Sequence, residues 1–388
     1  MCGRKRGDAL QDDPSRSASG QQAWHEARLT WSGRRAEIAA AGHSFFIESD
    51  AVAQGDHGRA DFAAFGLAIL SMSAGVAIRL DQPVSHGVAG ALQRLAQAFD
   101  LWQWPGLHPL RLWLPHIAPD VVPQGDARII CASGGVDSTS SAIEARAEGF
   151  THGLLIAGAD YPHDSVTAYG ELKDRVEAIC RTLGLTLIEV RTSLRQAPCN
   201  WEMLHTLGLA MCLYFVSPGF RAGGFALDNS LTQDLARHPW GNSAALAWIL
   251  GSGPFPIHGY GQHRDRIDKL RLIAAQTPQL VGHLAVCWRD TGSGGNCGAC
   301  EKCTWTRLAL LCCGLDESVA FPAAPPLAEA VRSRSVPARL YNVRGMYVRL
   351  VELLWHLPEG PEKALVGAHI IQLRKVMRQM ERGEIPAG

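Results

Sequence analysis

The sequence lacks an excess of charge of either sign, because 37 lysine and arginine residues balance 37 aspartate and glutamate residues. No global field therefore draws the chain to nucleic acid or to an anionic membrane, and we expect neither as its partner. It also lacks an apolar run of the roughly 20 residues that span a bilayer. The basic residues near Met1 are not followed by the hydrophobic region of a signal peptide. These absences predict a cytoplasmic protein.

The cysteines of this sequence do not suggest a framework of paired disulfides. Its eleven cysteines are an odd number, and most are scattered through apolar segments. This usage favours reduced thiols that pack in a core, together with one metal site.

The length of 388 residues predicts more than one domain. Residues 1–21 are polar and predict a disordered tail, whereas residues 22–123 mix strand and helix patterns and predict a small α+β domain. Residues 124–320 alternate apolar strands, such as "ARIICA", "THGLLIAG" and "LTLIEV", with helices. This alternation is typical of a doubly wound α/β domain with a parallel sheet. Residues 321–388 predict a helical C-terminal extension.

The segment "IICASGGVDSTSSAIEA" runs a strand through a glycine pair into a helix. A glycine-rich turn at a helix N-terminus offers backbone amides and a positive dipole end to an anion. An ordinary glycine turn with a serine N-cap is the alternative for a bare Ser-Gly-Gly. The longer pattern predicts a phosphate site that lacks the lysine of the GxxxxGK[ST] loop. Its expected members are Ser133, Gly134, Gly135, Val136, Asp137 and Ser138, with Asp137 and Ser138 also as catalytic candidates.

The second motif, "CWRDTGSGGNCGACEKC", spaces four cysteines as Cys-x9-Cys-x2-Cys-x2-Cys. Four thiolates in a glycine-rich loop predict a closed tetrahedral site for a structural zinc. An iron-sulfur cluster is the main alternative. The expected ligands are Cys287, Cys297, Cys300 and Cys303.

Three charged residues elsewhere are candidates for contact with a nucleotide. Asp160 follows an apolar strand at its carboxyl end, where open α/β sheets bind ligands. Arg264 and Lys269 could neutralise charge on a triphosphate, and Lys269 is a further catalytic candidate. A charge-rich, solvated helix start is the alternative interpretation of the segment that carries both cations.

The loop "SGGVDS" resembles the signature of the PP-loop ATP pyrophosphatases, which cleave ATP between the α and β phosphates and form adenylates. Together with the cysteine motif, residues 127–313 resemble 7-cyano-7-deazaguanine synthases. The resemblance implies Mg²⁺-ATP, a structural Zn²⁺, and adenylation of the carboxylate of 7-carboxy-7-deazaguanine. The segments that carry this resemblance include Asn200 and Asp228, which are candidate substrate contacts. His238, Trp240 and Asn242 are further candidates because they could stack on and hydrogen-bond a flat base, although a Pro-Trp loop such as 237–245 is about as often plain packing.

The chain departs from that family in two ways: about 125 residues precede the ATP loop, and the family's Tyr-Pro-Asp-Cys-Arg stretch is absent. Extended relatives resemble proteins of bacterial anti-phage defence systems, in which related chemistry joins a deazaguanine to a protein. We therefore expect a ligase whose acceptor is a protein amine docked by residues 22–123. The alternatives are an ordinary synthase that uses ammonia, a PP-loop enzyme that thiolates transfer RNA, and a non-catalytic nucleotide-binding partner. Residues 22–123 could instead stabilise a homodimer.

Overall fold

The computed structural model describes residues 23–386 apart from residues 53–57, 122, 124, 238, 252, 288 and 290–294. The predicted N-terminal tail therefore lies outside the described residues. The main sheet has eight strands in the order β13 (Ile257–Tyr260), β12 (Ala222–Ala226), β9 (Arg128–Cys131), β10 (His152–Ala157), β11 (Thr186–Thr192), β4 (His43–Glu48), β3 (Arg35–Ala40) and β2 (Arg28–Ser32). The first five strands in that order are mutually parallel. The predicted α/β architecture with a parallel sheet is confirmed.

Helices cover both faces of the parallel strands because alternate strand residues point to opposite sides. Ile129 packs into one core with α1 (Asp61–Ala74) and α5 (Trp201–Val216), whereas Ile130 packs into another with α3 (Val136–Ala147) and α4 (Val166–Leu183). Helices α2 (His86–Trp102) and α7 (Ala244–Leu250) also belong to the first core. Two-sided covering explains why these strands are apolar without interruption.

The segment 22–123 shares the sheet and the core of the segment that follows it. Strand β4 pairs antiparallel with β11, so that β4, β3 and β2 extend the sheet at one edge. Helix α1 packs against α5, and Gly66 makes this close approach feasible: a Cβ atom there would lie 2.6 Å from Phe45 Cζ and 2.9 Å from Met211 Sδ. Smaller sheets join β1 (Trp24–Glu26), β5 (Ala77–Arg79) and β7 (Leu112–Trp113), and β6 (Val84–Ser85) with β8 (Ile117–Ala118).

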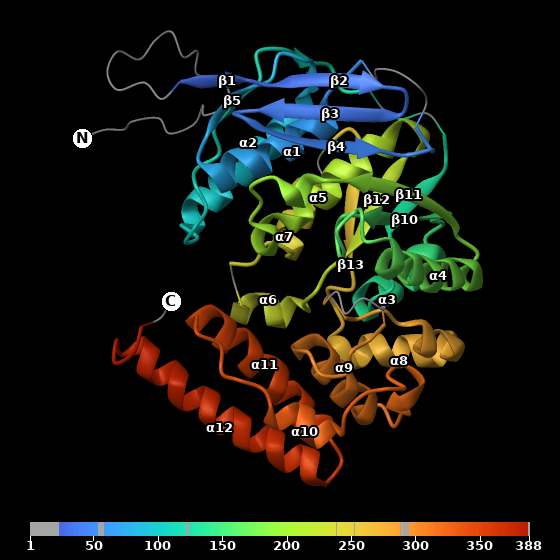
Figure 1. Ribbon diagram of the computed structural model, residues 1–388, viewed down its shortest axis with the longest axis vertical. Helices are drawn as coiled ribbons and strands as arrows, with labels where there is room; N and C mark the ends of the chain where they lie inside the picture. The colour runs from blue at the N-terminus through green and yellow to red at the C-terminus, as the bar shows by residue number, and fades with distance from the viewer. Residues whose placement is uncertain are drawn as a thin grey trace.

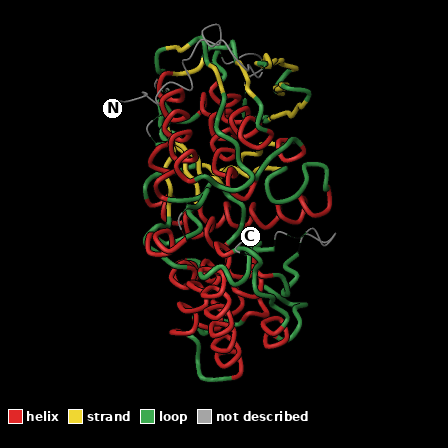
Figure 2. Tube along the Cα trace, turned by 90° about the vertical axis from the view of Figure 1, so that its left-hand side faces the viewer, coloured by secondary structure: helices red, strands yellow, loops and turns green. Residues whose placement is uncertain are grey.

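The C-terminal helices form a lobe at the end of the molecule opposite the N-terminal strands (Figure 1). Its elements are α8 (Arg266–Gln276), α9 (Glu301–Cys312), α10 (Leu327–Arg332), α11 (Leu340–His356) and α12 (Pro361–Glu381), and α6 (Leu231–Arg237) lies between this lobe and the sheet. Short 3-10 turns occupy residues 194–196, 217–219, 278–283 and 317–319. Within the described residues, strands are confined to the other part of the molecule (Figure 2). None of the described helices is both long enough and apolar enough to cross a membrane.

The sheet changes direction between β9 and β12. The chain passes from β9 to β10 on one side, and it later returns through α5 to place β12 on the other side of β9. Ligands of open α/β sheets bind outside the carboxyl ends of the strands at such a switch point. The loop that follows β9, with the predicted phosphate motif, starts at this position.

Candidate functional site

The loop after β9 is closed by its own backbone and by one hydroxyl. Gly134 has a φ of +72°, a left-handed conformation that glycine adopts without steric cost. Its carbonyl oxygen accepts a hydrogen bond from the Ala285 amide at 2.8 Å, and the Ser133 amide donates to Ser138 Oγ at 2.8 Å. Gly135 is the N-cap of α3, and its position provides no side-chain cap for the first turn. The positive end of α3 therefore presents backbone amides at the loop.

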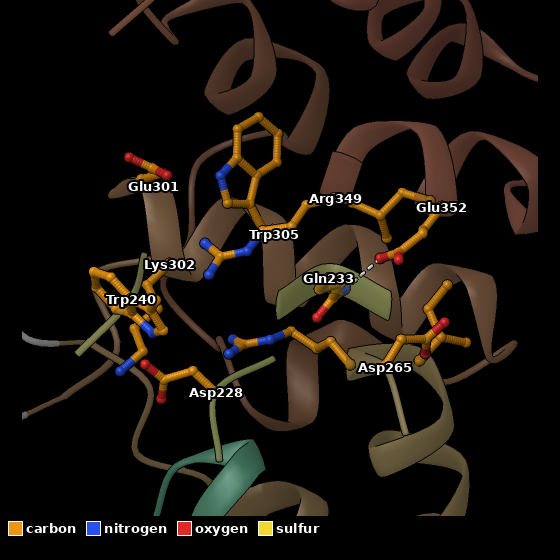
Figure 3. Close-up of a pocket in the computed structure, with 12 residues that line it drawn as sticks. Asp228, Gln233, Trp240, Asp265, Glu301, Lys302, Trp305, Arg349 and Glu352 are labelled. Atoms are coloured by element: carbon orange, nitrogen blue, oxygen red, sulfur yellow. Dashed lines mark hydrogen bonds between the residues drawn. The ribbon is translucent and has the colours of Figure 1, made fainter. Parts of the chain in front are cut away.

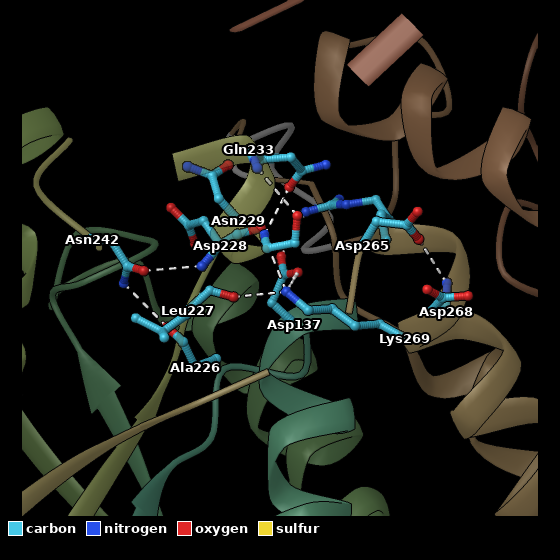
Figure 4. Close-up of polar contacts among 12 residues, drawn as sticks. Asp137, Ala226, Leu227, Asp228, Asn229, Gln233, Asn242, Asp265, Asp268 and Lys269 are labelled. Atoms are coloured by element: carbon cyan, nitrogen blue, oxygen red, sulfur yellow. Dashed lines mark hydrogen bonds and ion pairs between the residues drawn. The ribbon is translucent and has the colours of Figure 1, made fainter. Parts of the chain in front are cut away.

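Two cations from α8 hold the Asp137 carboxylate in the first turn of α3. Lys269 Nζ donates to Oδ1 at 2.8 Å, and Arg266 Nη2 donates to Oδ2 at 2.6 Å. The Lys269 side chain is fully buried, and its Nζ also donates to the carbonyl of Leu227 at 2.7 Å (Figure 4). Through these hydrogen bonds Lys269 connects α8 to α3 and to the loop after β12.

The charges around Asp137 decide its protonation. Burial alone would raise the pKa of this carboxyl, but Arg266 and Lys269 outweigh burial and hold the pKa well below its usual range. The carboxylate is therefore ionised, and each of its oxygens accepts a hydrogen bond from a cation. In this arrangement Asp137 fixes the loop, and its catalytic role stays a prediction.

A cavity of about 700 Å³ opens beside the loop, a volume typical of small-molecule sites. It brings together predicted residues from the ends of β9, β10 and β12: Ser133, Gly135, Asp137, Ser138, Asp160, Asp228, Trp240 and Asn242. Two loop members are not part of its wall. Val136 is buried in the core of the C-terminal lobe, and a Cβ atom at Gly134 would face Val176 and Ala285.

Several residues that line this cavity were not predicted from the sequence: Arg195, Trp201, Glu202, His205 and Lys302. They come from the turn after β11, from α5 and from α9, and only the tertiary fold brings these elements together. One signal was present in the sequence. Glu202 and His205 are polar residues three positions apart at the start of an otherwise apolar helix, so they share one face of it.

Asn242 and Trp240 shape the cavity by contacts within the protein. Asn242 Oδ1 accepts a hydrogen bond from the Asp228 amide at 2.9 Å, and its Nδ2 donates to the Ala226 carbonyl at 3.1 Å (Figure 4). The Trp240 ring is almost fully buried and stacks on Tyr341 of α11 with centroids 5.9 Å apart. Asn242 therefore anchors the loop after β12, while Trp240 joins the cavity to the C-terminal lobe.

The described lining of the cavity does not include three of the predicted contacts. Asn200 is the N-cap of α5, where its Oδ1 accepts a hydrogen bond from the Met203 amide at 3.3 Å. Arg264 forms an ion pair with Glu144 and does not line the cavity. The third residue, His238, lies outside the described residues. Arg266, two positions after Arg264, pairs with Asp137 of the loop and lines only the smaller cavity described next.

A second, smaller cavity of about 250 Å³ lies between α6, α8 and the helices α9 and α11 (Figure 3). Asp228, Trp240 and Lys302 line both cavities, so the two are neighbours. Arg349 and Glu352 of α11 belong to its wall. The C-terminal lobe therefore closes one side of the candidate site.

The four predicted metal ligands converge in the C-terminal lobe. Their Sγ atoms all lie within 4.8 Å of one another, with 3.9 Å between Cys287 and Cys300 and 3.8 Å between Cys297 and Cys303. Ligands about 2.3 Å from a tetrahedral zinc stand about 3.8 Å apart, so these sulfurs could hold such an ion. A four-iron cluster binds each thiolate to a different iron atom and would need a wider spacing. The predicted four-cysteine metal site is thus confirmed as a geometric arrangement.

Two side chains brace the cysteine loop. Asn296 Oδ1 accepts hydrogen bonds from the amides of Val286 and Cys287, and its Nδ2 donates to the Leu284 and Ala320 carbonyls. The buried Arg307 forms a bidentate ion pair with Glu317 and donates to the Gly298 carbonyl at 2.8 Å. These hydrogen bonds help to orient the ligands toward one another.

The metal site also positions a cation at the cavity. Lys302 stands between Cys300 and Cys303 in the first turn of α9, and it lines both cavities. Any ion that the sulfurs hold would fix this turn of the helix. The geometry of the metal site and the charge of the cavity are therefore linked through one residue.

No family model matches the sequence, and comparison with curated proteins and with solved structures likewise gives no match.

Gly134→Ala tests the predicted phosphate site, and we expect it to weaken ATP binding at least tenfold. An alanine there would have to adopt a φ of +72°, and its Cβ would lie 3.2 Å from Val176 Cγ2 and 3.3 Å from Ala285 Cβ. Gly149→Ala is the matched control, because Gly149 has a φ of +87° with nothing within 4 Å of an added Cβ. Both variants should lose about 1 to 2 kcal/mol of stability. Equal ATP affinity of the two variants in a calorimetric titration would contradict the assignment of the loop.

Proposed function

We propose that the chain is an adenylating ligase that cleaves ATP to AMP and pyrophosphate and joins the activated carboxylate to an amine. The observation that carries this proposal is the cavity of about 700 Å³ over the Ser133–Ser138 loop at the switch point of the sheet. A glycine-rich loop, the N-terminus of α3 and nearby cations form the environment that a polyphosphate requires. The sequence pattern of that loop favours a PP-loop fold and cleavage between the α and β phosphates.

In this proposal, the phosphates lie against the backbone amides at Gly135 and the Ser133 hydroxyl. Lys302 and Arg195 supply positive charge in the cavity wall, and Trp201 and Trp240 offer flat apolar surface for the nucleoside or for a deazapurine. Rate acceleration would come from positioning and from charge neutralisation rather than from a protein nucleophile.

Two metal ions belong to the proposal. Asp160 is the cavity carboxylate that we assign to Mg²⁺ with ATP, because both oxygens of Asp137 are already engaged by cations and Asp228 lies beside His205. The four cysteine sulfurs would hold Zn²⁺, which would order the loop and the start of α9. Neutralisation of phosphate charge is the chemistry that Mg²⁺ supplies when bound.

The substrate that we propose is 7-carboxy-7-deazaguanine, on the basis of the two sequence motifs together. The acceptor that we propose is a protein amine in an anti-phage defence reaction in the cytoplasm, and residues 22–123 would dock that protein. The N-terminal strands lie at the far edge of the sheet from β12 and β13, so a docked protein would approach the cavity from the β11 side. Ammonia is the alternative acceptor.

The single described cysteine of the cavity wall makes transfer-RNA thiolation a less favoured function. Such an enzyme needs a cysteine that can carry a persulfide, and among the described lining residues Cys131 is the one cysteine. Burial raises the pKa of its thiol to about 12, so the thiol stays protonated at neutral pH and is a poor sulfur carrier.

The proposal predicts that the full chain converts ATP to AMP when given Mg²⁺, 7-carboxy-7-deazaguanine and an amine. The measurement combines nucleotide analysis with the masses of small molecules and of intact proteins, with ammonium or candidate proteins as the acceptor. Reactions without the deazaguanine carboxylate are the control and should release no AMP. Free amide or nitrile would identify ammonia as the acceptor, and a deazaguanine-sized addition to a protein would identify a conjugating enzyme. Intact ATP, or cleavage to ADP, would contradict the proposal.

A further inference from the structure

His205 lies on the cavity wall in the first half of α5, between two tryptophans. Its ring centroid is 6.2 Å from that of Trp201 and 6.0 Å from that of Trp240. Nε2 of His205 stands 4.0 Å from Oδ2 of Asp228, at the carboxyl end of β12. The imidazole is mostly buried, and it lines the same cavity as the Ser133–Ser138 loop. It thus belongs to the surface that we assign to the reacting groups.

Backbone carbonyls fix the tautomer of this histidine. Nδ1 of His205 lies 3.2 Å from the Trp201 carbonyl oxygen and 3.1 Å from the Glu202 carbonyl oxygen. A carbonyl oxygen can only accept a hydrogen bond, so Nδ1 carries the proton. In the neutral ring Nε2 then has a free lone pair, and this is the nitrogen on the side of Asp228. The side chain is therefore oriented as a proton acceptor whose charged form would gain a carboxylate partner.

We propose that Nε2 of His205 accepts the proton that the amine loses when it attacks the acyl adenylate, an inference that rests on the proposed ligase function. The neutral amine forms a C–N bond to the acyl carbon, and the C–O bond to the phosphate of AMP breaks. AMP leaves with the electron pair of that bond. The nitrogen, positively charged after attack, transfers one proton to Nε2, and the Asp228 carboxylate stabilises the resulting imidazolium.

The charged groups that share the cavity with His205 set the conditions for this transfer. They are Asp137, Asp160, Arg195, Glu202, Asp228 and Lys302. Of these groups, Asp228 is placed to partner the imidazolium, since its Oδ2 stands 4.0 Å from Nε2. The proton moves only after the amine has attacked the acyl carbon, so loss of Nε2 should slow amide formation without preventing formation of the adenylate.

The test separates the two halves of the reaction in the full-length protein with Mg²⁺-ATP, 7-carboxy-7-deazaguanine and ammonium. His205→Asn keeps an amide donor where Nδ1–H stands but removes Nε2. Exchange of labelled pyrophosphate into ATP reports adenylation, and the mass of the product reports amide formation. His258→Asn is the matched control, since His258 lies exposed on β13 outside both cavities.

We expect His205→Asn to keep pyrophosphate exchange within about twofold of the wild type and to slow amide formation about 10² to 10⁴-fold. His258→Asn should match the wild type in every assay. Amide formation that falls no more than exchange would overturn the role of His205 alone. A wild type without carboxylate-dependent exchange would overturn the ligase function and this inference together.

Discussion

Asp137→Asn should lower the free energy of unfolding by about 3 to 5 kcal/mol and abolish AMP release, because it leaves a buried cation without its partner. The Lys269 side chain is fully buried and forms its ion pair with this carboxylate at 2.8 Å. The remaining acceptors of Lys269 are backbone carbonyls, chiefly that of Leu227. Loss of the loop geometry and loss of stability therefore have the same cause. Urea denaturation would measure the loss of stability, and an assay of AMP release would measure the loss of activity.

The double variant Asp137→Asn/Lys269→Met is the control for that explanation. Removing both charges leaves neither group buried and unpaired, so the double variant should be more stable than Asp137→Asn, although still inactive. If the changes in unfolding free energy of the two single variants simply add in the double variant, the ion pair is not the source of the instability. A stable Asp137→Asn variant with normal turnover would contradict the assignment of the loop itself.

The same pair predicts how stability responds to acid. The pKa of Asp137 is held well below its usual range in the folded protein, so its contribution is fully present above the unfolded value of about 3.9. That contribution is lost as the pH falls toward the folded value. The stability difference between the wild type and Asp137→Asn should therefore be constant near neutral pH and shrink below about pH 4.

Local patterns in the sequence were sufficient for the centre of the fold. The apolar segment Arg128–Cys131, the glycine pair after it and the helix from Val136 are where the pattern predicts them. The four cysteines converge because short spacings and glycines leave few other arrangements. In each case the signal lies within about 20 residues of sequence, so no long-range packing had to be inferred.

Contacts between distant segments could not be predicted in the same way. The short strand Arg35–Ala40 carries a weak alternation, and nothing local shows that β4 pairs with β11 about 140 residues later. A deletion of residues 1–123 would therefore expose α5 and the edge of β11, and it would not be a clean test of partner docking. The boundary at residue 123 stays a prediction about folding units.

Among neighbouring cations, only three-dimensional geometry shows which one faces the site. Arg264, Arg266 and Lys269 lie within six positions of one another in the sequence. Arg264 pairs with Glu144, whereas Arg266 and Lys269 reach Asp137 because both project from the same face of α8. The sequence between Cys300 and Cys303 does not indicate that Lys302 lines the cavity. The position of Lys302 depends on how the cysteine loop packs against the rest of the fold.

Cys300→Ser should remove the metal and unfold the C-terminal lobe under conditions in which the sheet remains folded. Cys300 is the N-cap of α9, and its Sγ accepts a hydrogen bond from the Cys303 amide at 3.4 Å. Serine is a favoured N-cap, so the substitution preserves the cap while it removes a soft metal ligand. The loss should be a large part of the roughly 10 to 16 kcal/mol that structural zinc contributes in small domains.

Cys313→Ser separates metal binding from the general loss of a thiol near the end of the same helix. The Cys313 sulfur lies 3.6 Å from the Ile267 carbonyl oxygen and is not part of the four-sulfur cluster, so this variant should keep one metal per chain. Metal analysis, thermal denaturation and ATP titration of both variants form the measurement. Because Lys302 stands between two of the ligands, Cys300→Ser should also weaken ATP binding even where the sheet is intact. Unchanged metal content in Cys300→Ser would reject the site, and unchanged ATP affinity after metal loss would show that the lobe does not control the cavity.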